Sequence, residues 1–243
     1  MWIASIFDTE RFAAAQDGRV CWGGGTVFAD RNDAGRQLGA ALLPYAGTPV
    51  VLFALARGGV PVALDAARVL GAPLQLALVR KVGLPSYPEL AMGAVMDGHP
   101  PAVVRNENVI ASQRISEQQF GECLQRELEE IQRRRRLYLM EDDEHDLRGK
   151  TAIIIDDGLA TGATMRAAIK GLRARQPERI VVAVPVSAPD ILPVMHREAD
   201  EVVCLETPSD FGAVGMYYRH FPQLTDQEVL EALQQARDFS RGG

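Results

Sequence analysis

The stretch "TAIIIDDGLATGATM", residues 151–165, constrains the fold more than any other part of this 243-residue chain. Its first five residues are β-branched or apolar without alternation, which predicts a strand that is buried on both faces and parallel to its neighbours. The small residues that follow lead into "MRAAIKGLRAR", where apolar residues recur at helical spacing. A strand, a tight loop and a helix in this order indicate an α/β fold.

The loop and the two acids of this stretch each predict a ligand. A loop of small residues that opens a helix exposes backbone N–H groups at the positive end of the helix dipole, where a phosphate binds well. Asp156 and Asp157 are adjacent at the end of a buried strand, so they must be solvated, hydrogen-bonded or bound to metal. A ligand with both a phosphate and a diol, such as a ribose 5-phosphate, suits this pattern. The alternative is an ordinary strand-to-helix turn in which the Asp pair is a cap.

The same residues resemble the phosphoribosyl-pyrophosphate (PRPP) signature of type I phosphoribosyltransferases, and are closest to the form in adenine phosphoribosyltransferase. The resemblance implies that family's fold, which is α/β with a doubly wound, mainly parallel sheet flanked by helices and a small hood from the terminal segments. It also implies a set of PRPP-binding residues: Asp156, Asp157, Gly158, Leu159, Ala160, Thr161, Gly162, Ala163, Thr164 and Met165.

The rest of the chain alternates between predicted strands and helices. The strands are "VVLFAL", "LQLALV", "RIVVAVPV" and "EVVCLE". Asp30 is the expected cap of a helix in "DRNDAGRQLGAALLPY", Gly71 closes one in "VPVALDAARVLG", and "APDILPVMHREA" forms a third. This rhythm agrees with a doubly wound sheet. Residues 1–25 are predicted to be an extension, and residues 26–243 the phosphoribosyltransferase domain.

A long charged helix is predicted over about residues 112–140. Phe120, Leu124, Leu128 and Ile131 form an apolar stripe at helical spacing. The four arginines at 133–136 follow interleaved acids, which favours a solvated or subunit-facing helix surface over a patch for polyanions. A homodimer agrees with such a surface.

Two further stretches resemble parts of the family's site. "ALARGGVPVA" places Arg57, Gly58 and Gly59 after the first buried strand, where doubly wound folds bind ligands, and resembles the pyrophosphate loop. The resemblance implies a cis peptide before or at Arg57. "RKVGLP" follows the predicted strand "LQLALV" and places Arg80 and Lys81 at its end. It resembles the start of the mobile catalytic loop in adenine phosphoribosyltransferase, which implies a role for Arg80 and Lys81 and a lid around residues 82–100. A solvated strand end is the alternative for this Arg-Lys pair.

The segment that would contact the base is less specific. "TPSDFGAVGMYYRHF" resembles the segment that hypoxanthine-guanine enzymes place against the base, with Phe211 at the position that stacks on it. Packed or interfacial aromatics are the alternative. Ala160 stands where those enzymes have an acid thought to remove a proton, so Glu89 in the lid is a candidate proton acceptor, with a lid-surface carboxylate as the alternative. Which base is accepted stays open.

Composition excludes several classes of protein. A net charge of −6 gives no electrostatic footprint for nucleic acid or an anionic membrane. The three cysteines are far apart and odd in number, so they predict neither a disulfide framework nor a metal site. No apolar run reaches the roughly 20 residues of a membrane span, and the first residues carry acids where a signal peptide is basic. We expect a cytoplasmic protein.

The resemblance therefore implies an enzyme of purine salvage. It would transfer 5-phosphoribosyl from PRPP to a nitrogenous, purine-like base and release pyrophosphate, with Mg²⁺ as cofactor held indirectly by Asp156 and Asp157. Two alternatives remain. One is a regulatory protein that senses PRPP or a nucleotide without catalysis. The other is a receiver or phosphatase-like domain in which the acids bind magnesium directly.

Overall fold

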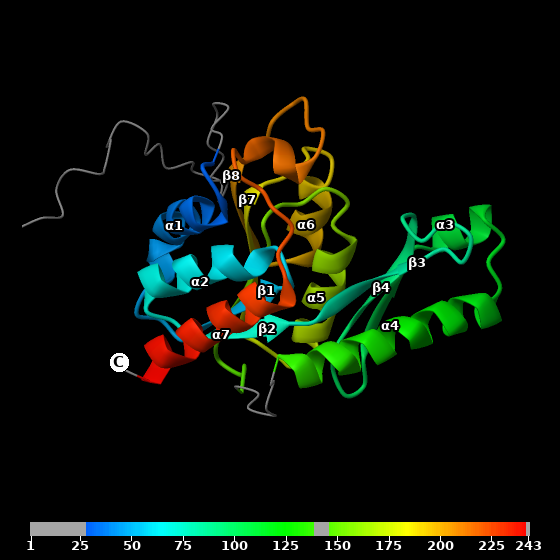
Figure 1. Ribbon diagram of the computed structural model, residues 1–243, viewed down its shortest axis with the longest axis horizontal. Coiled ribbons are helices and arrows are strands. Elements are labelled where there is room, and N and C mark those ends of the chain that lie inside the picture. Colours follow the sequence, from blue (N-terminus) through cyan, green and yellow to red (C-terminus); the bar gives the residue numbers. More distant parts are fainter. Residues whose placement is uncertain (1–27, 139–145, 242–243) are drawn as a thin grey trace, which may run out of the picture.

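A computed structural model of the chain describes residues 28–138 and 146–241. Its centre is a five-stranded parallel sheet with the strand order β2-β1-β6-β7-β8 (Figure 1). These strands are β1 (Val50–Leu55), β2 (Leu74–Ala77), β6 (Thr151–Ile155), β7 (Arg179–Val186) and β8 (Glu201–Glu206). The doubly wound parallel sheet predicted from the sequence is confirmed.

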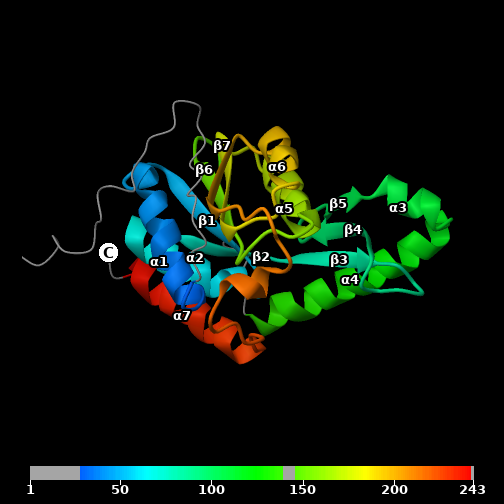
Figure 2. The same ribbon diagram turned by 90° about the horizontal axis from the view of Figure 1, so that it is seen from above.

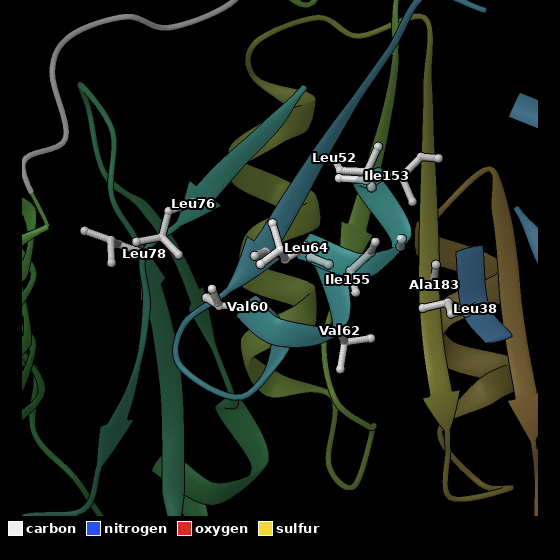
Figure 3. Close-up of a cluster of buried hydrophobic side chains, with 14 of the residues drawn as sticks. Leu38, Leu52, Val60, Val62, Leu64, Leu76, Leu78, Ile153, Ile155 and Ala183 are labelled. Carbon is white, nitrogen blue, oxygen red and sulfur yellow. The ribbon is translucent and has the colours of Figure 1, made fainter. Parts of the chain in front are cut away.

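The sheet is buried on both faces because its strands are apolar at successive positions. In β6, Ile153 and Ile155 pack on one face of the sheet, and Ile154 packs on the other. Figure 3 shows the first of these cores, to which the strand residues Leu52, Ile153 and Ile155 and the helix residues Val60 and Val62 all contribute side chains. The continuous apolar runs in the sequence are thus explained by helices on both sides.

Helices cover both faces of this sheet (Figure 2). One face carries α1 (Arg31–Ala41), α2 (Gly59–Leu70) and α7 (Asp226–Arg241), and the other carries α5 (Ala163–Arg173) and α6 (Leu192–Glu198). The Asp30 side chain accepts a hydrogen bond from the Asp33 amide at the start of α1, and α2 ends at Gly71 in the left-handed conformation. Both predicted helix ends are confirmed. Two short 3₁₀ turns, η2 (Leu43–Tyr45) and η3 (Val214–Tyr217), complete this part.

A second sheet forms an arm that extends away from the first (Figure 1). It is antiparallel, with the order β3-β4-β5, and consists of β3 (Val79–Gly83), β4 (Ala91–Met96) and β5 (Ala102–Arg105). Two helices belong to it, α3 (Glu107–Ser112) and α4 (Glu117–Leu137). The arm rests on α5 so closely that a side chain at Gly171 would overlap the Met96 thioether.

The arm corrects three predictions. "LQLALV" is not one strand, because the chain leaves the parallel sheet at Leu78 and enters the arm. The lid predicted for residues 82–100 is wrong over 91–96, which form β4 and are almost entirely buried. The long helix begins at Glu117 rather than near 112, since Ser116 and Gln119 form a capping box there.

The arginine run of α4 is largely paired within the chain. The Glu130 carboxylate accepts hydrogen bonds from Arg133 and Arg134, and Arg135 binds Asp97 at 2.9 Å. This pairing within the chain argues against a patch for polyanions. Arg133 and Arg136 are exposed, whereas Arg134 and Arg135 are only partly exposed, so the prediction of a solvated helix surface holds for part of the run, and a subunit-facing surface stays a prediction. The arginines hold the pKa of Glu130 down to about 2, with Arg133 as the main cause.

We expect Glu130→Gln to lower the free energy of unfolding at pH 7 by about 0.3–1 kcal/mol, the usual range for a partly exposed ion pair. A lowered native pKa stabilises the fold above the unfolded pKa of 4.5, and this contribution is lost as the pH falls toward about 2. Denaturant unfolding at several pH values should therefore show the difference between the variant and the wild type vanish near pH 2. Glu129→Gln is the control, because the hydrogen bond that Glu129 accepts within the described part of the chain comes from Gln125 and not from an arginine. Equal effects of both variants at every pH would contradict this.

Cys123 and Cys204 are buried, and Cys21 and the predicted extension lie outside the described residues. Within the described ranges, no helix is both long and apolar enough to cross a bilayer.

Candidate active site

Two loops meet at the carboxyl ends of neighbouring strands. β1 and β6 pair in parallel with Ala54 opposite Ile155, so the residues that follow the two strands are neighbours in space. One loop carries Arg57 and two glycines, and the other begins with Asp156 and Asp157. The carboxyl edge of a parallel sheet is where doubly wound folds bind ligands.

The two glycines allow the first loop to lie directly on the acids. A Cβ atom at Gly59 would lie 2.5 Å from the Ile155 carbonyl oxygen. A Cβ atom at Gly58 would overlap the Asp157 carboxylate. Only glycine permits this approach. The peptide between Ala56 and Arg57 is cis, as the resemblance implied.

The acid pair has one direct cationic partner among the described residues. Arg31 Nε donates to Asp157 Oδ2 at 2.9 Å, and both side chains are mostly buried. Burial raises the pKa of Asp157, and the charge of Arg31 acts in the opposite direction. Burial, followed by the charge of Asp157, raises the pKa of Asp156 well above its usual range. Two carboxyl groups in this setting favour a bound cation or hydroxyl groups.

The second loop leaves backbone amides available where α5 begins. Gly162 precedes the helix with a φ of +69°, and a side chain there would meet Ile191. Within the described part of the chain, the N–H groups of residues 160–165 donate to no protein acceptor. Ala160 and Thr161 are exposed, and Ala163 and Thr164 are partly exposed. The loop therefore has the free donors and the helix N-terminus that an anion requires.

The start of this loop is fixed to the next strand. The Leu159 amide donates to the Val186 carbonyl, and the Ala188 amide donates to the Leu159 carbonyl. Gly158 is close to Val214, whose Cγ1 would lie 2.6 Å from an added Cβ. These contacts hold the loop rigidly next to the acids.

Arg57 lies near the end of the long helix and the start of the last one. Its Nη1 is 3.9 Å from Asp226 Oδ1, and the same oxygen accepts a 2.6 Å hydrogen bond from the buried Tyr138 hydroxyl. Arg57 is about one third exposed, so the guanidinium remains accessible to a ligand.

Three candidate residues lie on the arm, with partners of their own. Arg80 and Lys81 were predicted at a strand end but lie within β3, opposite Val95 and Ala94. Arg80 Nε donates to Glu127 at 2.8 Å, and Lys81 Nζ donates to the Glu89 carbonyl at 2.9 Å. The Glu89 side chain is 86% exposed and 3.8 Å from Lys81. No contact among the described residues joins these three side chains to the acid pair.

Phe211 is partly buried and stacks on Tyr217, with ring centroids 5.6 Å apart and an interplanar angle of 16°. This contact is the one expected of packed aromatics. Stacking on a base would use the other face of the ring.

Sequence reasoning missed three residues of the site, which are Arg31, Tyr218 as a partner of Asp157, and Asp226. Arg31 carried a signal, because a cation in the first turn of a helix opposes the helix dipole. A cation at this position therefore indicates a compensating interaction elsewhere, such as an ion pair. The other two residues carried no comparable signal.

The oxygen atoms of Asp156 and Asp157 suit a hard cation such as Mg²⁺, which prefers one or two carboxylates together with oxygen atoms of a phosphate ligand. No group of three or more potential metal ligands occurs within the described residues. The donor set fits an ion that is held mainly by its ligand and only indirectly by this chain.

Comparison with known proteins defines the class of protein. The model of the phosphoribosyl transferase domain matches residues 33–219, and the chain belongs to this family. In sequence, the chain is 44% identical over 218 residues to two curated proteins of Mycobacterium tuberculosis, strains CDC 1551 / Oshkosh and H37Rv, each with the name "Putative phosphoribosyl transferase". The match covers 89% of the chain, which spans about half the length (49%) of these curated relatives.

A solved structure agrees in both fold and sequence. The crystal structure of TT1426 from Thermus thermophilus is 38% identical, with a TM-score of 0.72. The match covers 86% of this chain and 98% of that chain. The family and the α/β architecture inferred from "IIIDDGLATGAT" are thus confirmed.

Proposed function

We propose that this chain transfers a 5-phosphoribosyl group from PRPP to a nitrogen of a base and releases pyrophosphate, or catalyses the reverse reaction. One observation carries the proposal. The loop with Arg57 lies directly on Asp156 and Asp157, next to a helix N-terminus with unbonded amides. A cation, two acids and a phosphate site thereby come together at one sheet edge, and PRPP has a matching pyrophosphate, diol and 5-phosphate.

The proposed chemistry is mainly electrostatic. Cleavage of the C1–O bond builds positive charge on the ribose and negative charge on the pyrophosphate, and charges placed in advance stabilise both. Arg57 and the amides after it bind the pyrophosphate, and residues 161–165 bind the 5-phosphate. Asp156 and Asp157 bind the ribose hydroxyls. Because the sugar is held at both ends, C1 is positioned for attack by the base.

Mg²⁺, when bound, would neutralise charge on the pyrophosphate and would be held by PRPP oxygens, with Asp156 and Asp157 binding it through water. Arg80 and Lys81 are proposed to act with Arg57 on the leaving group. Both would have to exchange their present partners, Glu127 and Glu89, for the ligand. Since residues 91–96 form β4, we propose the hairpin turn at residues 84–90 as the part of the predicted lid that could cover the site and exclude water.

We propose Asp157 as a ribose ligand, and we expect Asp157→Asn to weaken PRPP binding more than folding. Loss of a charge-assisted hydrogen bond costs about 1.5–3 kcal/mol, so the Kd for PRPP should rise by about 10- to 150-fold. Isothermal titration with PRPP and Mg²⁺ measures the change. Asp146→Asn is the control, because that acid is exposed and its partner among the described residues is Arg148. An unchanged Kd would contradict the assignment.

Glu89 is proposed as the proton acceptor, since Ala160 provides none. General base catalysis typically contributes about 10²- to 10⁴-fold, so Glu89→Gln should lower turnover by about that factor and leave PRPP affinity almost intact. Steady-state kinetics with the accepted base measures the turnover of Glu89→Gln and of the wild type. A change of less than about threefold would assign Glu89 to the hairpin surface, with the proton leaving through water or pyrophosphate.

The experiment that tests the whole proposal incubates the protein with PRPP, Mg²⁺ and a pool of bases, and follows pyrophosphate and new nucleotide. Product with a purine would support purine salvage, with Phe211 beside the base. PRPP binding without pyrophosphate release from any base would instead favour the sensing protein. In the described part of the chain, Arg80 and Lys81 both bind residues of the arm, so neither contacts the proposed pyrophosphate site. This observation favours the sensing protein as the second candidate function. A cytoplasmic location and a homodimer remain predictions.

A further inference from the structure

Arg31 is a buried arginine with three interactions at the site. Only 8% of the residue is exposed. Its Nε binds Asp157 Oδ2 at 2.9 Å, its Nη1 donates to the Pro222 carbonyl at 2.8 Å, and its guanidinium lies 3.7 Å from the centre of the Phe221 ring. The long planar side chain thus links the second acid to a segment 65 residues further along the chain (157 to 222).

The same segment, residues 218–226, reaches the site at two other points. The buried Tyr218 hydroxyl donates to the Asp157 backbone carbonyl at 2.6 Å. At the other end of the segment, Asp226 lies 3.9 Å from Arg57. Two contacts of this segment therefore reach the acid pair and the proposed pyrophosphate loop directly, and its contacts from Phe221 and Pro222 reach the acid pair through Arg31.

Most of this arrangement lies beyond the shared domain. The family model matches residues 33–219, so Arg31 precedes the match, and Phe221, Pro222 and Asp226 follow it. Asp157 lies within the matched region, whereas Arg31, the ion-pair partner of its carboxylate, lies outside it. Membership of the family alone therefore does not assign a role to Arg31.

Arg31 occupies only one oxygen of Asp157. A buried carboxylate without a partner is costly, and Arg31 compensates the charge through Oδ2. No N–H group among the described residues donates to Oδ1. The Asp156 carboxyl group lies within hydrogen-bonding reach of the Asp157 carboxylate. The bond to Arg31 fixes the orientation of the Asp157 carboxylate.

We propose that Arg31 is a positioning residue: its charged bond to Oδ2 holds the Asp157 carboxylate with Oδ1 turned toward a ligand hydroxyl, and it makes residues 218–226 part of the binding site. This inference deepens the proposed function and rests on it, since the hydroxyl would be that of ribose. Among the described residues, the ionisable groups that face Asp157 are Arg31 from α1, Asp156 from its own loop and Tyr218 from the last segment.

The first test needs no ligand. Carboxyl ¹³C NMR of the full chain follows the titration of Asp157, with Asp157→Asn used to assign the signal. Loss of a neighbouring cation should raise the pKa of Asp157 by about one unit or more in Arg31→Met. Arg31→Lys keeps the charge and should raise it by less, so the charge is tested even if the Met variant folds poorly.

Arg135→Met is the matched control. Arg135 and Asp97 also form a 2.9 Å pair, with side-chain exposures of 16% and 11%, close to the 9% and 14% of Arg31 and Asp157. This variant should lose comparable stability and leave the titration of Asp157 unchanged. An Asp157 titration in Arg31→Met equal to that of the wild type would overturn the proposal.

The second test is a double-mutant cycle with PRPP and Mg²⁺. Arg31→Met should weaken PRPP binding about tenfold in the wild type but less than about threefold when Asp157→Asn is already present, because Arg31 acts through Asp157. Equal weakening in both backgrounds would show a merely structural role and overturn the proposal. If the wild type does not bind PRPP, the proposed function fails, and the NMR titration still decides the role of Arg31.

Discussion

Replacement of Arg57 by alanine is expected to lower the rate of phosphoribosyl transfer by about 10²- to 10³-fold, the loss usually seen when one preorganised donor to a developing anion is removed. Arg57 is the cation on the loop that lies against the acids, and it remains about one third exposed. Its ion-pair partner within the described residues, Asp226, is at 3.9 Å, which is too long for a hydrogen bond. The guanidinium is therefore ready to bind a ligand.

This effect should fall on kcat more than on KM, because the pyrophosphate gains charge as the bond breaks. Steady-state kinetics with PRPP as the varied substrate separates the two constants. Arg36→Ala is the control, since Arg36 is an exposed arginine of α1 whose ion pair among the described residues is a 3.5 Å contact to Asp33. An unchanged kcat for Arg57→Ala would remove this residue from the chemical step.

Replacement of Gly59 by alanine is expected to disturb both the fold and the site. The new Cβ would lie 2.5 Å from the Ile155 carbonyl oxygen and 2.9 Å from the Asp156 Cα, and both atoms belong to the backbone of the strand end. No rotation of a side chain relieves these contacts, so the Arg57 loop must move away from the acids. We expect a loss of about 1–3 kcal/mol in the free energy of unfolding and at least about a tenfold rise in the Kd for PRPP.

Gly121→Ala provides the opposite control. Gly121 lies inside α4, with nothing within 4 Å of an added Cβ, so alanine should stabilise the protein by about 0.5–1 kcal/mol. Thermal unfolding and PRPP titration of both variants measure the two effects. Wild-type PRPP affinity in Gly59→Ala would contradict the role of the close loop contact.

The sequence predicted the parallel sheet well because its strands are apolar on both faces. The bounds of β1, β6, β7 and β8 agree with the predicted runs. The arm was missed because local patterns do not show where a chain changes sheets. "LQLALV" is apolar on both sides of Leu78, and "AMGAVM" contains a single β-branched residue and no aromatic residue, unlike a typical strand. Its small residues are explained by close packing, since a Cβ at Gly93 would lie 2.6 Å from the Val104 carbonyl oxygen.

The site was predictable to the extent that it is local in sequence. The acid pair, the amides after it and the Arg57 loop each follow one strand, so their positions come from the strand order. Arg31 and Asp157 are 126 positions apart, and no pattern connects them. Arg80 and Lys81 were assigned by a short resemblance, and their partners Glu127 and Glu89 are known only from the folded arm.

The place of the arm in the chain has a consequence for folding kinetics. Val50 of β1 pairs with Thr151 of β6, about one hundred positions later, and the whole arm lies between them. Closing so long a loop is entropically costly, whereas the hairpins of the arm join neighbouring residues. An arm that folds early shortens the effective loop and brings β1 and β6 together. In pulsed hydrogen exchange, amides of β3–β5 and α4 should then gain protection before those of β6, and the Arg57 loop would meet Asp156 and Asp157 only in the last stage.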